Sequence, residues 1–319
     1  MNLFVTIISL LLIIIYRSLR NRSRIKCFTK KAFKQLNGKN VCITGASSGL
    51  GKEIARIFYQ HGCNIILASR RTDELERVKE EFLAIGNGFP NEPNIIRLDL
   101  GSVEQSEIVA RKITEKYKLD ILINNAGISS RAQALDTVID VDEKLLTVNF
   151  LGHIAFTKII LKSMINNNMN GKILAISSIQ DRLPVPFRSS YSSSKHALRA
   201  WYDSIRSELS LIAPKILISL LSPGYIQTNI SMNAMNSDGS KYGRMDSTTE
   251  SGYKPEYVAA IAVEMLLNND QECLLAPFLH RIIVIIRILC PNLYFFIMKI
   301  NSRQIRRQQQ QQSNTNISS

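Results

Sequence analysis

The sequence predicts an α/β domain built on a single, doubly wound parallel sheet with helices on both faces. From Gly38 onward, short apolar segments alternate with amphipathic ones. The apolar segments are continuous runs rich in Val and Ile, as expected for strands that are buried on both faces. A glycine-rich turn joins the first apolar segment to the first amphipathic one. Such alternation indicates parallel strands connected by crossover helices.

The elements follow one another in a regular order. NVCIT and NIILAS are the first two predicted strands, and KEIARIFYQ is the helix between them. Each strand is a run of apolar and β-branched residues bounded by polar residues or glycine. The same pattern predicts strands at 40–44, 64–69, 94–100, 120–124, 172–177 and 216–222, and helices at 52–60, 72–83 and 103–117.

Both ends of the chain differ from this central body. Residues 17–34 carry eight basic side chains and no acid, and the chain after Glu272 carries six more with no acid. These fourteen equal the net charge of +14, so the body between them is neutral. Basic ends on a neutral body favour an anionic membrane surface over a nucleic-acid groove. Two solvated basic tails are the alternative.

The N-terminus predicts a single-pass membrane anchor. Residues 1–16 are uncharged and span about 24 Å as a helix, slightly less than a ~30 Å hydrocarbon core. The basic run that follows places the body in the cytosol, and a cleavage-site pattern is missing. A short anchor suits a thin membrane such as the endoplasmic reticulum, with the peroxisome as a second candidate. A signal peptide or a buried core helix is the alternative.

Three further regions complete the organisation. The segment 225–253 is rich in Ser, Asn, Gly and Met, which predicts a lid or binding loop. Residues 278–300 are hydrophobic but contain two arginines and a proline, which predicts a helix that contacts a membrane or a partner. The Gln-rich residues 301–319 are predicted to be disordered. We therefore expect an anchor at 1–17, a basic linker at 18–37, a catalytic domain at 38–277, the hydrophobic helix at 278–300 and the tail at 301–319.

TGASSGLG at 44–51 follows the first strand and opens the first helix. Its glycines let the backbone approach a pyrophosphate at the helix N-terminus. The GxxxGxG spacing differs from the GxGxxG of many dinucleotide sites, and a plain glycine-rich turn is the alternative. The predicted cofactor-binding residues here are Gly45, Ser47, Ser48, Gly49, Leu50 and Gly51.

The end of the second strand, ASRR at 68–71, bears on the choice of nucleotide. An acid at this place binds the adenosine ribose diol in NAD sites, and Ser69 stands there instead, followed by Arg70 and Arg71. A guanidinium can bind a 2′-phosphate bidentately, whereas an acid repels it. The pattern predicts NADP(H) in preference to NAD(H), with a solvated arginine pair as the alternative.

Two more strand ends complete the predicted cofactor shell. Ligands of open parallel sheets bind at the carboxyl ends of the strands. LDL at 98–100 therefore predicts contacts from Asp99 and Leu100, and NNAG at 124–127 predicts contacts from Asn125, Ala126 and Gly127. Asn124 is expected either to cap the strand end or to take part in catalysis. The five scattered cysteines lack zinc spacing, so no metal site is predicted.

YSSSK at 191–195 is the candidate proton-transfer motif. Tyr191 and Lys195 stand at i and i+4, so they share a helix face. A cation near a phenol lowers its pKa from near ~10, as proton exchange with a substrate hydroxyl requires. Ser178 is predicted to hydrogen-bond the substrate carbonyl, with Ser177 as its rival because alternate strand residues face opposite ways. A YxxxK spacing also arises by chance.

Together these residues resemble the short-chain dehydrogenase/reductase family over roughly residues 38–276. TGASSGLG, NNAG, Asn149, Ser178, the Tyr191/Lys195 pair and SPGYIQT at 222–228 occur in the family's order. Four segments narrow the resemblance to one branch of the family: ISSIQ (176–180), PFRSSYSSSKHA (186–197), SPGYIQTN (222–229) and DGSKYGRMD (238–246).

The resemblance implies a Rossmann-type domain with an Asn–Ser–Tyr–Lys tetrad. Asn149 would hold a helix bend and an ordered water, and Ser178 would orient the substrate carbonyl. Tyr191 would be the acid–base, and Lys195 would bind the nicotinamide ribose and depress the tyrosine pKa. It also implies cofactor contacts from Pro223, Gly224 and Thr228, and a possible homodimer. Asp181 departs from the family, in which glycine often stands three residues after the serine, and this is expected to reshape the substrate pocket.

The predicted protein is a membrane-anchored, NADP(H)-dependent oxidoreductase of lipid metabolism that interconverts a carbonyl and an alcohol. Attachment to a membrane favours a lipophilic substrate such as a steroid, a retinoid, or an acyl- or alkyl-dihydroxyacetone phosphate. The alternative is a non-catalytic, cofactor-binding membrane adaptor with the same fold. The complete tetrad favours the enzyme.

Overall fold

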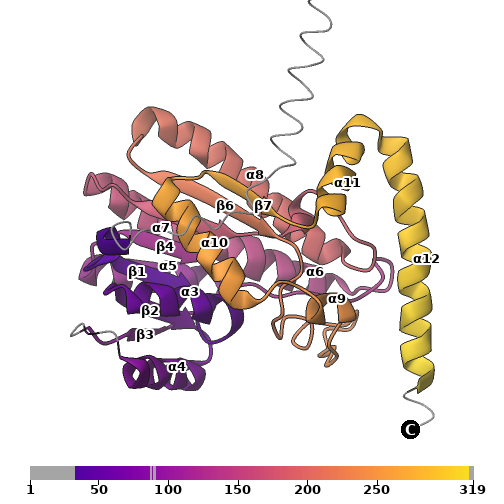
Figure 1. The fold of residues 1–319 in the computed structure, drawn as a ribbon, viewed down its shortest axis with the longest axis horizontal. Coiled ribbons are helices and arrows are strands. Elements are labelled where there is room, and N and C mark those ends of the chain that lie inside the picture. Colours follow the sequence, from indigo (N-terminus) through magenta and orange to yellow (C-terminus); the bar gives the residue numbers. More distant parts are fainter. Residues whose placement is uncertain (1–32, 87, 89–90, 316–319) are drawn as a thin grey trace, which may run out of the picture.

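The computed structural model describes residues 33–86, 88 and 91–315 of the chain. At its centre lies a sheet with the order β3-β2-β1-β4-β5-β6-β7, in which each adjacent pair is parallel (Figure 1). The strands are β1 (Asn40–Thr44), β2 (Asn64–Ser69), β3 (Asn94–Arg97), β4 (Ile121–Asn124), β5 (Lys172–Ile176), β6 (Leu217–Pro223) and β7 (Glu272–Leu275). The predicted Rossmann-type α/β fold is confirmed. The short edge strand β7 was not predicted.

Helices cover both faces of this sheet. The first face carries α3 (Gly49–Gln60), α4 (Thr72–Ile85) and α10 (Pro255–Asn268), and the second carries α5 (Val103–Lys116), α7 (Gly152–Asn166) and α8 (Ser189–Ile212). Alternate strand residues serve the two layers, since Val41 and Ile43 pack in the first core and Cys42 packs in the second. Burial on both sides explains why the strands lack a polar alternation.

The strand order reverses between β1 and β4. From β1, the strands β2 and β3 lie on one side of the sheet, and β4 to β7 lie on the other. The connections leaving two such strands diverge at their carboxyl ends, which opens a crevice there. This edge of the sheet also receives the 225–253 segment, which is mostly irregular and contains the short helix α9 (Ser247–Glu250).

A local irregularity precedes α7. Helix α6 (Ile139–Leu146) passes through a π-helical turn, η2 (Thr147–Leu151), before α7 begins. By length and composition this 139–166 stretch is the one described helix that could cross a membrane, but 56% of its apolar window is buried inside the domain. It packs against α5 and α8 as a core helix. The predicted anchor at 1–17 lies outside the described residues.

The C-terminal region differs from the sequence prediction in two ways. The single helix expected over 278–300 is two helices, α11 (Phe278–Leu289) and α12 (Pro291–Thr315), because Pro291 cannot continue a helix but fits the first position of a new one. The disorder predicted from 301 is wrong for residues 301–315, which continue α12. Gln and Arg have high helix propensities, and their abundance here supports this extension.

The predicted third strand is also shorter than expected. Its last three residues leave the sheet, and the side chain of Asp99 accepts a hydrogen bond from the backbone N–H of Gly101 at 2.9 Å. A side chain that caps its own turn in this way competes with strand pairing. Asp99 therefore lies on a turn at the mouth of the crevice.

Candidate active site

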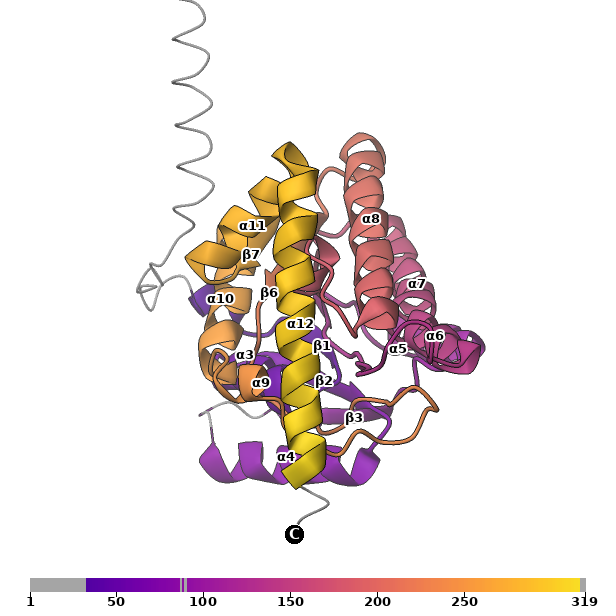
Figure 2. The ribbon, with the colours of Figure 1, turned by 90° about the vertical axis from the view of Figure 1, so that its right-hand side faces the viewer.

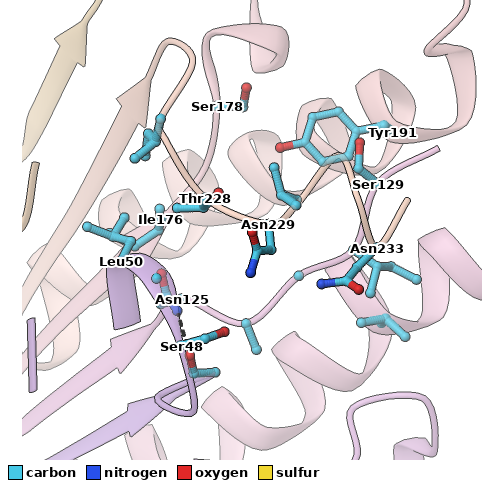
Figure 3. Close-up of a pocket in the computed structure, with 18 of the residues that line it drawn as sticks. Ser48, Leu50, Asn125, Ser129, Ile176, Ser178, Tyr191, Thr228, Asn229 and Asn233 are labelled. Atoms are coloured by element: carbon cyan, nitrogen blue, oxygen red, sulfur yellow. Dashed lines mark hydrogen bonds between the residues drawn. The ribbon is translucent and has the colours of Figure 1, made fainter. Parts of the chain in front are cut away.

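A cavity of about 500 Å³ lies at the carboxyl edge, over the reversal between β1 and β4. Figure 3 shows its lining side chains drawn from the glycine turn, the β4 exit, α8 and the 225–253 segment. Nearly all the residues predicted to bind the cofactor or to react line this cavity. The two exceptions, Gly51 and Asn149, lie directly behind its wall.

The glycine turn is shaped by close backbone approach. A Cβ at Gly45, where φ is +68°, would lie 2.8 Å from the Cα of Ala126, and one at Gly51 would lie 2.4 Å from the carbonyl oxygen of Gly45. Neither position can hold a larger residue without movement of the backbone. Asn125 fixes the turn from the β4 side by donating hydrogen bonds to the carbonyls of Thr44 (3.1 Å) and Gly45 (3.3 Å). The turn therefore holds the N-terminus of α3 open to an anionic group.

The end of β2 carries the side chains that bear on the nucleotide. Arg71 donates hydrogen bonds to the hydroxyls of Ser47 (3.1 Å) and Ser48 (3.2 Å), and Ser69 donates to Ser47 at 3.0 Å. Arg70 also lines the cavity. A guanidinium and three hydroxyls thus surround the place where an acid would bind a ribose diol. This donor set fits an NADP-type 2′-phosphate.

The proton-transfer pair lies on the opposite wall. Tyr191 is 7% exposed and forms a hydrogen bond with Ser178, while Lys195 is 4% exposed and donates to the carbonyl of Ile176 at 3.1 Å. In Figure 3 the phenol oxygen of Tyr191 points into the cavity, toward the side where Ser178 lies. The contact with Tyr191 distinguishes Ser178 from its rival Ser177, whose hydroxyl is buried without a hydrogen-bond partner in the structure.

The pKa of Tyr191 departs from the sequence expectation. Burial raises it above its usual value, and the hydrogen bond from Ser178 and the positive charges of Arg131 and Arg188 act in the opposite direction. The predicted lowering by Lys195 is not what the structure has, because desolvation is the larger effect. Burial lowers the pKa of Lys195 to about 8, and the negative charge of Asp181 opposes that shift.

Asn149 acts from behind the cavity. It lies in the π-helical turn and is fully buried. Its amide oxygen accepts from the N–H of Ile128 at 2.8 Å, and its nitrogen donates to the carbonyl of Ile128 (2.9 Å) and to the hydroxyl of Ser194 (3.0 Å). Asn149 therefore ties the β4 exit to α8 beside Lys195.

Asn124 has a structural place. It is 1% exposed, does not line the cavity, and donates to the hydroxyls of Thr157 (2.8 Å) and Tyr202 (2.9 Å). The hydroxyl of Tyr202 also contacts the ring of His153 at 2.8 Å. Burial lowers the pKa of His153 to about 3, and Lys195 acts in the same direction, so this imidazole is neutral. This polar cluster supports the end of β4.

Asp181 likewise faces away from the cavity. Its side chain is fully buried and accepts a hydrogen bond from the hydroxyl of Ser222 at 2.5 Å, near the end of β6. It is not among the lining residues, so its direct effect is on the charge balance of Lys195 and not on the pocket surface. Asp181, the residue that departs from the family pattern, is therefore accommodated below the pocket surface, where it contacts Ser222.

Sequence reasoning missed a charged group on the open side of the cavity. Asp246, in the 225–253 segment, accepts hydrogen bonds from Arg131 (2.7 Å) and Arg188 (3.1 Å), both of which line the cavity. Burial by itself raises the pKa of Asp246, but the two guanidinium groups outweigh it and lower that pKa. Arg188 stands three residues before Tyr191, and this adjacency was the available signal. The same segment contributes Asn229 and Asn233 to the wall.

The family follows from comparison with known proteins. A family model of short chain dehydrogenases matches residues 39–239. The dehydrogenase/reductase SDR family protein 7-like of Drosophila melanogaster is 43% identical over 270 residues, which are 84% of this chain and 82% of that protein. The chain belongs to the short-chain dehydrogenase family. Dehydrogenase/reductase SDR family member 7B of Mus musculus is 39% identical over 268 residues, 84% of this chain and 82% of its own, and this confirms the branch predicted from the motifs.

Solved structures of the family share the fold. An alcohol dehydrogenase from the archaeon Thermococcus sibiricus, complexed with 5-hydroxy-NADP, is 28% identical with a TM-score of 0.62, and 75% of this chain covers 96% of it. A short chain dehydrogenase/reductase from Burkholderia phymatum, in complex with NAD, is 22% identical with a TM-score of 0.71 over 81% of this chain and 95% of its own. The chain is thus an oxidoreductase of a family in which some members bind NAD and others bind NADP.

The buried Lys195 predicts a pH dependence of stability. Its folded pKa of about 8 lies below the ~10.5 of an unfolded lysine, so the folded state binds fewer protons between these values and stability rises with pH. We expect Lys195→Met to have a higher free energy of unfolding than the native chain near pH 7. This difference should shrink by roughly 2 kcal/mol by pH 9.5. Urea denaturation at both pH values measures it. Lys162→Met, at an exposed position on α7, controls for the loss of one lysine. A pH-independent difference would contradict the argument.

Proposed function

We propose that this protein is a membrane-anchored, NADP(H)-dependent oxidoreductase that interconverts a carbonyl and an alcohol. The observation that carries the proposal is the convergence of Tyr191, Ser178 and Lys195 on the cavity that the glycine turn also lines. Asn149 completes the tetrad from behind through Ser194 and Ile128. A binding protein without catalysis would need only the nucleotide half of this cavity.

The residues of the cavity divide the chemical work. A nicotinamide held in this cavity would supply or accept the hydride at the substrate carbon. Ser178 orients the substrate oxygen toward the phenol, and Tyr191 donates its proton to that oxygen as the alcohol forms, or takes it back in oxidation. A raised pKa keeps Tyr191 protonated at neutral pH, which suits the reducing direction. Lys195, held by the carbonyl of Ile176, is in position to hold a ribose hydroxyl.

The preference for NADP(H) rests on the end of β2. Arg71 bridges Ser47 and Ser48 at the glycine turn, so a guanidinium and two hydroxyls face the adenosine side of the cavity. A carboxylate that would favour the ribose diol of NAD(H) is replaced by Ser69. Asp99 and Leu100 line the cavity, and we assign them to the adenine. Pro223, Gly224 and Thr228 also line it, and we assign them to the nicotinamide.

The substrate is proposed to be a lipophilic ketone, as membrane attachment through residues 1–17 favours. Steroids, retinoids and lipid ketones of the acyl- or alkyl-dihydroxyacetone phosphate type are the candidates. Arg131 and Arg188 share the single carboxylate of Asp246, which leaves one positive charge on the substrate side. An uncompensated guanidinium favours a ketone that carries an anionic group. We place the protein at the endoplasmic reticulum or the peroxisome with its catalytic domain in the cytosol, as a possible homodimer.

Removing the phenol hydroxyl tests the catalytic claim. Tyr191→Phe removes the proton donor, and we expect the rate of NADPH-dependent ketone reduction to fall by about 10²–10⁴-fold. NADPH binding and the urea denaturation midpoint should stay near their native values. Tyr257→Phe makes the same chemical change on α10, away from the cavity, and should leave the rate unchanged. Native turnover in Tyr191→Phe would remove the proposed function.

Arg71 tests the choice of nucleotide. Arg71→Ala removes a charge-assisted contact worth about 1.5–3 kcal/mol, so we expect NADPH to bind roughly ten- to a hundredfold more weakly and NADH to bind as before. Fluorescence titration with both nucleotides measures this. Arg77→Ala removes an arginine that is 72% exposed on α4, the helix that Arg71 precedes, and serves as the control. Equal losses for the two nucleotides would show that Arg71 does not select a 2′-phosphate.

A substrate panel tests the lipid ketone. We expect purified protein with NADPH to reduce a phosphate-bearing lipid ketone more efficiently than a neutral steroid or retinoid carbonyl. Arg188→Met should lower kcat/KM for the phosphate-bearing ketone about tenfold, as loss of one charge-assisted contact predicts. It should lower kcat/KM less for neutral carbonyls, which depend on Arg188 only through its effect on the Tyr191 phenol. Arg188→Lys keeps the charge and should retain part of the preference. Inertness toward the whole panel would refute a lipid substrate.

A further inference from the structure

A small hydrophobic cluster joins the two C-terminal helices to the wall of the cavity. Tyr294 of α12 packs with Ile179, which directly follows Ser178 and itself lines the cavity. The hydroxyl of Tyr294 donates to the carbonyl of Pro184 at 3.2 Å. Helices α11 and α12 therefore rest on residues 179–188, the connection between Ser178 and α8.

The outer surfaces of these two helices are apolar. Leu293, Phe296 and Ile300 stand at i, i+3 and i+7 and form one exposed stripe along α12. Tyr294 and Met298, at i and i+4, face the domain instead. The exposed apolar side chains of α11 and α12, from 43% to 73% accessible, are Phe278, Leu279, Ile288, Leu289, Leu293, Phe295, Phe296 and Ile300. Contiguous exposure of this kind marks a surface that binds something.

The charges around this surface select its partner. Lys299, Arg303 and Arg306, at i, i+4 and i+7, form an exposed basic stripe beside the apolar one, and the chain has no acid after Glu272. A second copy bound about a two-fold axis through this face would bring like charges together. An apolar stripe with aromatic residues and a flanking row of cations is the composition of a helix that lies in the interface of an anionic bilayer.

We infer that α11 and α12 form an interfacial membrane-binding element, with the apolar stripe of α12 in the bilayer interface and its cations among lipid phosphates. Figures 1 and 2 show α12 along the side of the domain where α9 lies, which is the carboxyl edge of the sheet. Lipid contact there turns the mouth of the cavity, with Ile179 in its wall, toward the membrane. The inference extends the proposed membrane attachment and needs no contribution from residues 1–17.

Tryptophan placement tests this orientation. The full chain carrying Phe296→Trp is reconstituted into phosphatidylcholine–phosphatidylserine vesicles with brominated acyl chains, and the native chain, whose single tryptophan is Trp201, gives the baseline. We expect the brominated lipid to quench most of the fluorescence added at position 296. Leu211→Trp is the matched control, since Leu211 is an 85% exposed apolar residue near the end of α8, at the amino edge of the sheet. Quenching at 211 and not at 296, or quenching at neither, would overturn the inference.

A charge reversal tests the lipid class. Lys299→Glu with Arg303→Glu, in the Phe296→Trp chain, removes two cations that each strengthen contact with an anionic surface about fivefold. Quenching on the mixed vesicles should fall accordingly. Equal quenching of the unreversed chain on phosphatidylcholine alone would overturn the assignment to an anionic surface. NADPH-dependent reduction of a water-soluble ketone by the same proteins separates these outcomes from failure of the catalytic proposal, because none of the altered residues lines the cavity.

Discussion

The cavity depends on one junction, where Thr44 at the end of β1 meets Asn125 at the end of β4. The hydroxyl of Thr44 accepts hydrogen bonds from the N–H groups of Asn125 (3.0 Å) and Ala126 (3.1 Å), and the Asn125 side chain returns two hydrogen bonds to the glycine turn. These bonds hold two strands together at the place where their outgoing connections must part. The glycine turn leaves on one side of the junction, and the loop that Asn149 braces leaves on the other. The candidate nucleotide-binding and proton-transfer residues are therefore aligned by the same few contacts.

Desolvation sets the electrostatics on the proton-transfer side. Tyr191 and Lys195 are both buried, so the charged form of each is disfavoured: the pKa of Tyr191 rises, and the pKa of Lys195 falls to about 8. The cations that act on the phenol in this structure are Arg131 and Arg188, from the β4 exit and the approach to α8. Because Asp246 holds both guanidinium groups, the 225–253 segment is coupled to the charge at the reacting phenol. The placement of that segment and the charge around Tyr191 thus depend on one ion-pair cluster.

The sequence predicted the parts of the molecule that depend on local pattern. Continuous apolar runs identified six strands, and motif spacing identified the residues of the glycine turn and of α8, because strand ends and helix faces bring them to one edge. The predicted shift in the pKa of Tyr191 was wrong in direction. A YxxxK spacing indicates a nearby cation, but it does not indicate how deeply the tyrosine is buried. Arg131 and Asp246 lie 115 positions apart, and no periodicity links them. The edge strand β7, ECLL, contains no β-branched residue and only one buried side chain, so it lacks the Val- and Ile-rich pattern of the predicted strands.

The connection after β5 explains why this chain tolerates its departure from the family pattern. Ser178 stays at the cavity, and the next three residues form a short 3-10 turn, η3 (Ile179–Asp181), that directs side chains to two different supports. Ile179 packs toward α12, while Asp181 turns inward and accepts a hydrogen bond from Ser222 at the end of β6. A glycine at 181 would leave the Ser222 hydroxyl without this acceptor in a buried place, which costs about 1–3 kcal/mol. The turn η3 is thus held on its buried side by the Asp181 carboxylate and on its outer side by the C-terminal helices. These two supports together fix the position of Ser178.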